Sequence, residues 1–294
     1  MRVVITGATG QVGRALLAQL AEHAPVAVVR PGSKRPPLEV EYVELDLDSA
    51  WSPGTRALPE RCDAVVYLAQ SNTYRDLPAH ADSLFRVNVV SVASMLEYAR
   101  AAGATHFVLA SSGSVYLPSA EPLRESSPLI CAGSDGQLYA WSRRSAEELV
   151  ASYRAHFVTS VLRLFFVYGV GARPDTLVPT VVERVRRGAA VTLQGHDGLV
   201  ITPTWAGDAA AACRAALSRE RPGVFNVAGP EAVSLRELAL TAGEVFAREP
   251  RFEQGAGVPA QFRVSIDAMR AELGVAPRDL RTGLGQLAAN AARG

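Results

Sequence analysis

Short apolar runs alternate with stretches of helical periodicity along the first half of the chain. Residues 3–5, Val-Val-Ile, end at a Thr-Gly pair, as the apolar run of a buried parallel strand does. Val12, Leu16 and Leu20 then recur at the spacing of one helix face. This alternation is typical of an α/β fold with a doubly wound parallel sheet. It predicts further strands at 26–29, 40–45, 64–69, 107–110 and 158–167 and helices at 81–102 and 140–156.

The pattern changes after Gly169, where glycine and proline interrupt the apolar runs. Ser234 and Glu237 have the spacing of a capping box that opens a helix running to about residue 248. The other predicted elements are a helix at 177–187, a helix at 209–217 with Asp208 as its N-cap, a strand at 224–227 and two short final helices. The predicted domains are a sheet-forming domain at 1–170, to which 203–229 return, and a smaller region at 171–202 and 230–294.

Composition and charge exclude several classes of protein. The 294 residues are 48% hydrophobic and carry a net charge of +1 without a basic block, so we expect neither nucleic acid nor a membrane surface as a partner. The first residues do not form a signal peptide, and no apolar run reaches the ~18 residues of a membrane helix. Cys62, Cys131 and Cys213 do not have the spacing of a zinc site or a disulfide framework. We therefore expect a cytoplasmic protein with free thiols and no metal.

A glycine-rich loop, Thr-Gly-Ala-Thr-Gly-Gln-Val-Gly at 6–13, joins the first predicted strand to the first helix. Gly7 permits the tight turn, Gly10 lets backbone amides approach a pyrophosphate, and Gly13 lets the helix pack close to the sheet. The phosphates then meet the positive end of the helix. This position favours a dinucleotide site over an ordinary turn. The residues predicted to contact the cofactor here are Gly7, Thr9, Gly10, Gln11, Val12 and Gly13.

The end of the second predicted strand indicates which dinucleotide binds. An NAD site usually has an acidic side chain there, whereas this chain has Arg30, followed by Lys34 and Arg35. An arginine in this place stacks on adenine or pairs with a 2′-phosphate. We therefore predict NADP, with NAD as the alternative. Asp46 and Leu47 end the third strand, and we expect Asp46 either to contact the adenine amine or to cap a turn.

Four further segments accompany the glycine loop. They are Leu68-Ala69-Gln70, Asn88-Val89, the run from Ser111 to Tyr116, and Tyr-Ala-Trp-Ser-Arg at 139–143. With the TGxxGxxG loop they resemble the extended short-chain dehydrogenase/reductase family, in its NAD-dependent epimerase/dehydratase group. The resemblance covers nearly the whole chain. It implies a Rossmann domain followed by a smaller substrate-binding region, and it implies Leu68, Ala69, Gln70 and Asn88 as further cofactor contacts.

The resemblance also implies the catalytic residues Ser112, Tyr139 and Arg143, of which the last two contact the cofactor as well. Tyr139 transfers a proton to or from a substrate oxygen, and a cation one helical turn away stabilises its anionic form. Ser112 hydrogen-bonds the same oxygen, and the hydride moves to or from the nicotinamide. The family has lysine at position 143, and arginine keeps the charge without readily releasing a proton. Because Lys34 is the only lysine of the chain, we interpret Arg143 as a tolerated replacement rather than a crippling one.

Three departures from the family pattern concern the substrate. Gly113 and Ser114 stand where the family's 4,6-dehydratases have Asp-Glu, so we do not expect dehydration. Phe166 and Ile201 stand where nucleotide-sugar members have an asparagine and an arginine that contact the diphosphate. Loss of both contacts predicts a pocket that does not hold a diphosphate. The residues predicted to line it are Ser112, Ser114, Leu117, Trp141, Phe166, Leu177 and Trp205, each of which is also compatible with simple packing.

These residues predict an NADP-dependent ketoreductase that acts on a small, rather apolar, non-nucleotide ketone or secondary alcohol. An epimerase that oxidises and re-reduces one carbon uses the same residues and is the alternative. An inactive dinucleotide sensor is a third, disfavoured by the presence of Ser112 and Tyr139. The resemblance also implies a homodimer through the helices at 81–102 and 140–156. A stripe at helical spacing faces either the partner or the protein's own sheet, and it consists of Leu84, Val87, Ser91, Met95 and Tyr98.

Overall fold

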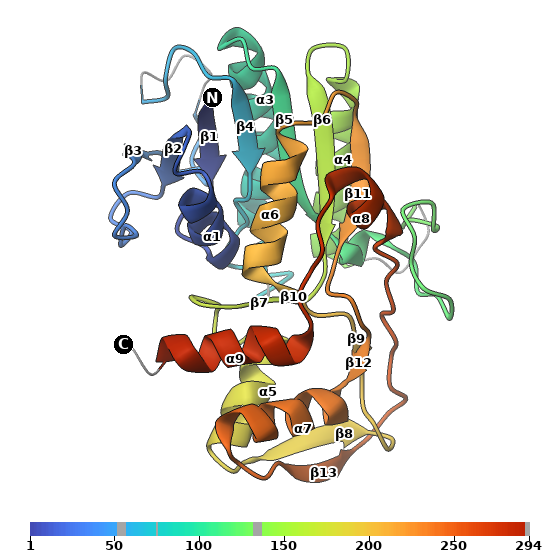
Figure 1. The fold of residues 1–294 in the computed structure, drawn as a ribbon. Helices are drawn as coiled ribbons and strands as arrows, with labels where there is room; N and C mark the ends of the chain where they lie inside the picture. Colours follow the sequence, from blue (N-terminus) through green and yellow to red (C-terminus); the bar gives the residue numbers. More distant parts are fainter. Residues whose placement is uncertain (52–56, 75, 132–136, 292–294) are drawn as a thin grey trace. The chain divides into compact units, whose positions relative to one another are not determined.

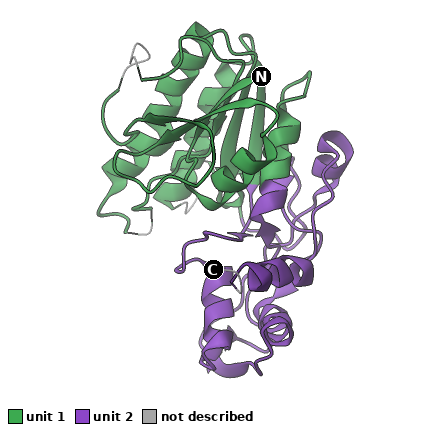
Figure 2. Ribbon diagram, turned by 60° about the vertical axis from the view of Figure 1, so that its left-hand side comes forward, with its two compact units in different colours: residues 1–117, 127–163, 210–225 green, residues 118–126, 164–209, 226–294 purple. Residues whose placement is uncertain are grey.

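The computed structural model describes residues 1–51, 57–74, 76–131 and 137–291. The chain forms two compact units, coloured separately in Figure 2. Unit 1 comprises residues 1–117, 127–163 and 210–225, and unit 2 comprises residues 118–126, 164–209 and 226–294. Within the described ranges, no helix combines the length and the hydrophobicity that crossing a bilayer requires.

Seven strands form the sheet of unit 1. They are β1 (Arg2–Thr6), β2 (Ala24–Val29), β3 (Glu41–Glu44), β4 (Ala64–Tyr67), β5 (His106–Ser112), β6 (Val158–Leu164) and β11 (Gly223–Val227). Their order is β11-β6-β5-β4-β1-β2-β3 (Figure 1), and β1 pairs in parallel with both β2 and β4. The chain thus winds outward from β1 in both directions, which confirms the predicted α/β fold with a doubly wound parallel sheet.

The helices of unit 1 differ from the prediction in two places. The predicted helix at 81–102 consists of α2 (Ala81–Phe85), a π-helical turn η1 (Arg86–Val90) and α3 (Ser91–Ala101). Such π turns occur frequently at functional sites. The predicted helix at 140–156 is α4 (Leu138–Ser152), because the chain then tightens into a turn in which His156 N donates to Tyr153 O at 2.9 Å. The helix after the glycine loop is α1 (Gln11–Gln19).

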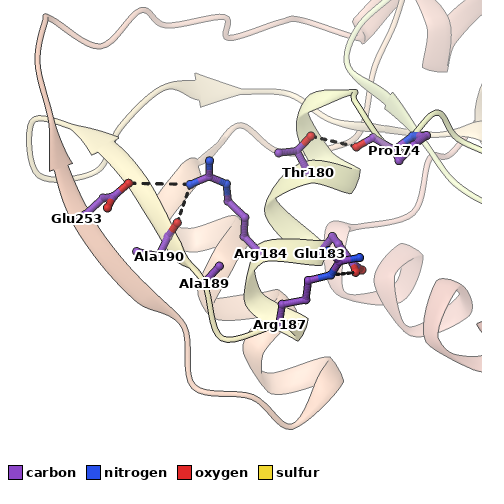
Figure 3. Close-up of a pocket in the computed structure, with 8 residues that line it drawn as sticks. All are labelled: Pro174, Thr180, Glu183, Arg184, Arg187, Ala189, Ala190 and Glu253. Carbon is purple, nitrogen blue, oxygen red and sulfur yellow. Dashed lines mark hydrogen bonds and ion pairs between the residues drawn. The ribbon is translucent and has the colours of Figure 1, made fainter.

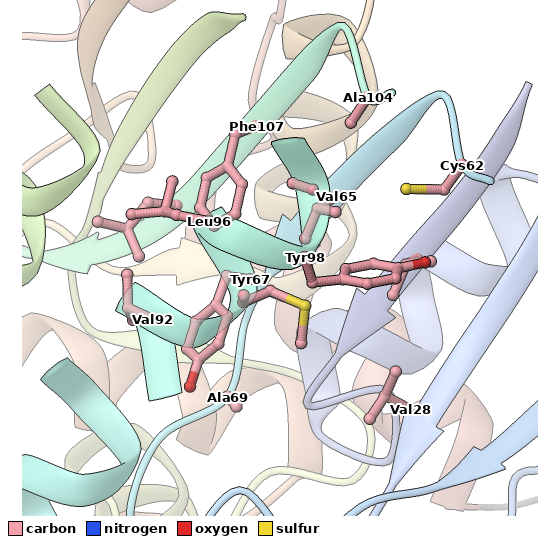
Figure 4. Close-up of a cluster of buried hydrophobic side chains, with 14 of the residues drawn as sticks. Val28, Cys62, Val65, Tyr67, Ala69, Val92, Leu96, Tyr98, Ala104 and Phe107 are labelled. Atoms are coloured by element: carbon pink, nitrogen blue, oxygen red, sulfur yellow. The ribbon is translucent and has the colours of Figure 1, made fainter. Parts of the chain in front are cut away.

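The hydrophobic core of unit 1 joins α3 to the sheet (Figure 4). Val92, Leu96 and Tyr98 of α3 belong to one buried cluster with Val65 of β4 and Phe107 of β5. Each of these side chains is at most 4% exposed. Burial of such side chains against the sheet stabilises α3 in its place, at roughly 1.5–3 kcal/mol for a large apolar side chain.

The stripe of the predicted helix at 81–102, which is a candidate dimer contact by sequence, is buried inside the protein. None of its members, Leu84, Val87, Ser91, Met95 and Tyr98, is more than 7% exposed. The stripe therefore faces the protein's own core, as the second reading of the pattern predicted. It gives no support to a homodimer, which stays a prediction.

Unit 2 contains a second parallel strand pair, β8 (Ala190–Gln194) and β13 (Arg251–Gly255), with α5 (Leu177–Arg186) and α7 (Leu235–Phe246) (Figure 1). This pair was not predicted from the sequence, because both strands are only five residues long and β13 is largely polar. The two predicted C-terminal helices are α8 (Asp267–Leu273) and α9 (Leu280–Ala291). Four two-residue strands complete the unit, namely β7 (Val167–Tyr168), β10 (Thr204–Trp205), β9 (Val200–Ile201) and β12 (Val233–Ser234).

The two predicted helix caps have different outcomes. Ser234 Oγ accepts from Glu237 N at 3.1 Å and the Glu237 carboxylate accepts from Ser234 N at 2.7 Å, so the capping box of α7 is confirmed. The cap at Asp208 is wrong, because α6 (Ala206–Ala216) begins two residues earlier. Asp208 instead pairs with Arg278, whose Nε lies 3.1 Å away. Burial raises the pKa of the Asp208 carboxyl above its ordinary value, although the bonds from Arg278 oppose the rise.

The compact units divide the chain at other residues than the predicted domains do. Unit 1 ends at residue 163 rather than 170, and the segment that returns to it is 210–225 rather than 203–229. Residues 118–126 join unit 2 because Leu123 N donates to Arg263 O at 2.8 Å and Ser265 N donates to Leu123 O at 2.9 Å. The division of cofactor and substrate binding between the two parts stays a prediction.

Candidate active site

Tyr139 and Arg143 lie one turn apart near the start of α4. Side chains four residues apart share a helix face, so the guanidinium reaches back to the tyrosine. Arg143 Nε donates to the Tyr139 hydroxyl oxygen at 3.3 Å, and the guanidinium carbon lies 5.4 Å from the centre of the Tyr139 ring. A permanent cation thus stands beside the oxygen on which negative charge forms when tyrosine gives up its proton.

The guanidinium of Arg143 is buried, with 3% of the residue exposed. Its Nη1 donates to the Ala110 carbonyl oxygen at 3.2 Å and its Nη2 donates to Gln70 Oε1 at 2.8 Å. Among the residues that the structure describes, no carboxylate pairs with this guanidinium. A buried cation is costly unless hydrogen bonds compensate its desolvation, so the three bonds fix its position. Its charge is left to act on the phenol of Tyr139.

Gln70 completes this group from the loop after β4. The Tyr139 hydroxyl donates to Gln70 Oε1 at 3.0 Å, the same oxygen that accepts from Arg143. The ring of Tyr74, in the same loop, lies 5.3 Å from that of Tyr139. The sequence predicted Gln70 as a cofactor contact. No local sequence pattern indicated that its side chain hydrogen-bonds residues about 70 positions away.

Ser112 ends β5 and caps the short turn η2 (Gly113–Val115). Its Oγ accepts from Ser114 N at 3.2 Å. A hydroxyl that accepts keeps its own proton to donate, which is what a bond to a substrate oxygen requires. The catalytic roles of Ser112, Tyr139 and Arg143 stay predictions, now with this local geometry behind them.

A buried ion pair fastens α4 to the strand ends beside it. Glu147 and Arg163 are each about 4% exposed at the side chain and pair through two bonds, of 2.7 Å and 3.1 Å. Ser111 Oγ donates to Glu147 at 2.5 Å, and Arg163 Nη1 donates to the Tyr116 hydroxyl at 2.8 Å. Burial by itself lowers the pKa of Arg163, but the ion pair with Glu147 and the contact with Tyr116 together leave that pKa above its ordinary value. Ser111 and Tyr116 flank the turn that carries Ser112.

Asn88 lies in the π-helical turn and is fully buried. Its Oδ1 accepts from Ser71 N at 3.2 Å, and its Nδ2 donates to Ser142 Oγ at 3.0 Å. Ser142 Oγ in turn donates to the Tyr139 carbonyl oxygen at 2.8 Å. Asn88 thereby ties the loop after β4 to the helix turn that carries Tyr139. Its predicted contact with the cofactor stays a prediction.

The glycine loop packs closely against the loop after β4. Gly7 has φ +65°, and a Cβ on it would lie 2.8 Å from the Leu68 carbonyl carbon, so only glycine fits without strain. A Cβ on Gly13 would clash with the Gly7 carbonyl oxygen. Thr6 Oγ1 accepts from Leu68 N at 3.1 Å and from Ala69 N at 3.2 Å, which fixes the two loops side by side.

The start of α1 fits a phosphate group. Gly10 is the N-cap and offers no side chain to bind the first amides of the helix. Those amides have no partner within the helix and carry its positive dipole end, so they suit an anion. The remaining predicted contacts of this loop, Thr9, Gln11 and Val12, lie in the same loop and first turn of α1. A dinucleotide is therefore compatible with the residues present.

The predicted selectivity residues at the end of β2 lie at the surface. Arg30 is exposed, and its guanidinium faces the side-chain amide of Asn72, which accepts from it in its hydrogen-bonding orientation. Arg35 is engaged elsewhere, with Glu44 at 2.9 Å. Lys34 is exposed. Asp46 Oδ1 accepts from the backbone two residues on at 3.0 Å, which is the turn-capping alternative, and Leu47 is buried.

The predicted substrate residues of unit 1 follow β5. Ser114 is exposed and Leu117 is half-buried, with its N donating to the Pro128 carbonyl at 3.0 Å. Trp141 lies on α4 and is half-buried. These positions leave surface of Ser114, Leu117 and Trp141 for a ligand, and their contact with substrate stays a prediction.

The predicted substrate residues of unit 2 belong to its core. Trp205 is 7% exposed and its ring meets that of Tyr168 edge-on at 5.5 Å, so packing accounts for its burial. Leu177 begins α5 and packs against the same cluster. Phe166 has φ +41°, which is rare for a bulky residue, and its ring lies 5.6 Å from that of Phe262. Substrate contacts by these residues stay predictions.

A hollow of about 460 Å³ lies on unit 2, between α5, β8 and β13 (Figure 3). Its charged side chains bind one another or the backbone: Arg187 pairs with Glu183 at 2.5 Å, and Arg184 donates to the Ala190 carbonyl at 2.7 Å. Figure 3 shows no predicted site residue in it. The hollow therefore adds nothing to the candidate active site.

The sequence pattern of the NAD dependent epimerase/dehydratase family matches residues 3–228. The chain belongs to this family. The 3-diazoavenalumate denitrifying reductase of a Streptomyces species is 32% identical over 256 residues, which cover 83% of this chain and 82% of the relative. The probable UDP-glucuronate 4-epimerase of Rhizobium meliloti (strain 1021) is 28% identical over 220 residues, which cover 67% of this chain and 62% of the relative. The match thus spans less than two thirds of that epimerase.

A solved structure confirms the fold. The UDP-glucuronic acid 4-epimerase from Bacillus cereus, in complex with UDP-glucuronic acid and NAD, matches 100% of this chain and 99% of its own with a TM-score of 0.85 at 19% identity. Family membership makes this chain an oxidoreductase or epimerase of the extended short-chain dehydrogenase/reductase type, with a nicotinamide dinucleotide as its cofactor.

Proposed function

We propose that the chain epimerises a hydroxylated substrate by transient oxidation of a secondary alcohol to a ketone. The observation that carries the proposal is the Tyr139 hydroxyl, hydrogen-bonded at 3.3 Å by a buried guanidinium that no described carboxylate neutralises. Such a phenol exchanges a proton with a substrate oxygen. The likeness to two UDP-glucuronate 4-epimerases supports epimerisation as the outcome.

Tyr139, Arg143 and Ser112 have separate roles in the proposed proton transfer. A nicotinamide dinucleotide held by the glycine loop at 6–13 would supply the hydride exchange for this reaction. During oxidation, Tyr139 as phenolate takes the proton of the substrate hydroxyl, while Arg143 stabilises the phenolate and Ser112 donates a hydrogen bond to the substrate oxygen. During reduction, Tyr139 gives the proton back to the ketone oxygen. The carbon inverts when the ketone presents its other face before the hydride returns.

Net reduction is the second candidate. Its support is the Streptomyces relative named as a reductase, with 32% identity. Two further positions concern the substrate of either reaction, because they have no phosphate-binding side chain. Ile201 is fully buried and Phe166 packs on Phe262, so neither presents a donor to a diphosphate. We propose on this ground a non-nucleotide, rather apolar substrate for either reaction.

The experiment that separates the two reactions measures cofactor and product together. The protein is incubated with a panel of non-nucleotide hydroxy and keto compounds and with UDP-glucuronic acid. Inversion of a carbon without net change in dinucleotide absorbance identifies the epimerase, and stoichiometric consumption of reduced dinucleotide identifies the reductase. Dinucleotide binding without either reaction on any compound contradicts the proposal, and so does a reaction whose rate Tyr139→Phe leaves unchanged.

For the cofactor, we propose that Arg30 favours NADP(H). The support is its exposed cation at the end of β2, where an NAD site usually has an acid. The neighbouring solved structure carries NAD, which makes NAD the competing form. Titration of both dinucleotides, with the parent and with Arg30→Asp, decides between them.

A further inference from the structure

Gln70 lies near the start of the loop after β4 and is half-buried, and one atom of its side chain binds both Tyr139 and Arg143. A guanidinium has donors and no acceptor, so the atom of Gln70 that faces it at 2.8 Å is the amide oxygen. The Tyr139 hydroxyl, 3.0 Å from the same oxygen, is therefore a donor in this contact. Arg143 Nε already donates to the phenol oxygen, so the phenol proton points to Gln70.

We propose that Gln70 is a positioning residue that holds the hydroxyl proton of Tyr139 and keeps the tyrosine in its proton-donating form. The inference rests on the proposed role of Tyr139. In the phenolate form, the phenol oxygen and the amide oxygen would be two acceptors facing each other. Turning the amide would offer its NH₂ to the phenolate but set that NH₂ against the Arg143 donor. Gln70 thus favours the phenol, while Arg143 favours the phenolate.

The opposite effects of Gln70 and Arg143 on the Tyr139 phenol matter for proton transfer because the site has arginine at position 143. Arginine does not readily release a proton, so the proton that Tyr139 gives to a ketone oxygen does not come from Arg143. Gln70 holds that proton on the phenol until a substrate oxygen replaces the amide as acceptor. In net reduction the phenolate left after transfer is reprotonated from water, whereas in epimerisation it takes the proton of the next substrate hydroxyl. Among the residues that the structure describes, the titratable or charged groups with a contact to Tyr139 are Arg143 of its own helix and Tyr74 of the loop after β4.

The test is the pH dependence of Tyr139 in Gln70→Ala and Gln70→Glu. Removal of the acceptor moves the ionisation of Tyr139 to lower pH by roughly half a unit to one unit, the size of one hydrogen bond. A carboxylate in its place still accepts and adds negative charge, so it moves the ionisation to higher pH. Gln70→Met keeps the side-chain length and serves as the uncharged control where Gln70→Ala folds poorly.

Two measurements report the shift. The first is ultraviolet absorbance of tyrosinate in the cofactor-free protein, with the same titration of Tyr139→Phe subtracted to isolate one tyrosine. The second is the pH profile of turnover in the oxidative direction, which needs the phenolate. Opposite shifts in Gln70→Ala and Gln70→Glu support the inference, and unchanged titrations in folded variants overturn it. If Tyr139→Phe is as active as the parent, the proposed function fails, while the absorbance titration still decides the role of Gln70.

Discussion

At the scale of single residues, the site places a buried guanidinium, which pairs with no carboxylate of the described residues, beside the hydroxyl of Tyr139. Arg143 is buried, its three bonds go to neutral oxygens, and one of these is the Tyr139 hydroxyl oxygen. Lysine has a single point charge with three donors, whereas the planar guanidinium binds Tyr139, Ala110 and Gln70 at once. The larger group is accommodated because Gln70 provides an acceptor at its far side.

Tyr139→Phe should lower the turnover rate by about 10²-fold or more, because it removes the transferable proton and keeps the ring. Steady-state kinetics and dinucleotide binding should be measured together. Unchanged dinucleotide affinity shows that the loss is chemical. A Tyr139→Phe variant with parental turnover would sink the catalytic assignment.

Arg143→Ala should move the pH optimum for oxidation upward, because the phenolate loses the cation that stabilises it. Arg143→Lys restores a charge of the same sign on the same helix face and should retain most activity. The pH–rate profiles of parent, Ala and Lys variants check both expectations. Loss of turnover in Arg143→Lys with intact dinucleotide binding would show that the fork of the guanidinium has a role of its own.

At the scale of elements, the buried pair of Glu147 and Arg163 connects α4 with β6, and Ser111 and Tyr116 extend it to the end of β5 and the turn after it. Removal of one partner from a buried pair leaves the other charge without compensation, which is more costly than the pair is stabilising. We therefore expect the pair to fix the position of α4, which carries Tyr139, relative to the end of β5, which carries Ser112.

Glu147→Gln should lower the free energy of unfolding by roughly 3 kcal/mol or more, the usual cost of a broken buried pair. Glu148→Gln is the matched control on the same helix, because Glu148 is 60% exposed at the side chain and its ion pair within the described ranges is with the partly exposed Arg144. It should cost less than about 1 kcal/mol. Urea denaturation of the two variants beside the parent gives both values, and equal costs would contradict the argument.

At the scale of the whole molecule, the apolar stripe of α2, η1 and α3 is buried in the core of unit 1. A dimer contact therefore has to use another surface. Val90 in η1 is 59% exposed, on the helix that the family resemblance implies as a contact. Leu240 on α7 is 45% exposed and lies on a different unit. These two side chains allow the predicted homodimer to be tested without disturbing the core.

The parent should be a dimer by light scattering at micromolar concentration, and Val90→Arg should convert it to a monomer. A charge in the centre of an apolar contact is buried without a partner, whereas at an exposed monomer surface it costs little. Leu240→Arg should leave the dimer intact. A monomeric parent, or a dimer that survives Val90→Arg, would contradict a contact through this helix.

Local patterns in the sequence determined much of the fold and part of the site. The alternation of apolar runs and helical periodicity gave the strands and helices of unit 1, because burial on a sheet or on one helix face imposes its period on neighbouring residues. The capping box of Ser234 and Glu237 and the shared face of Tyr139 and Arg143 are likewise decided within one helical turn.

Only the tertiary structure decided which distant side chains meet. Gln70 binds Tyr139 across 69 residues, and the Asp208 carboxylate binds the Arg278 backbone across 70. The strand pair β8–β13 and the inward direction of the stripe at 84–98 also depend on how the chain packs. The physical reason is that the hydrophobic periodicity of a segment indicates its backbone conformation and which of its residues share a face. The partner on that face is chosen by core packing and by hydrogen-bond satisfaction over the whole fold.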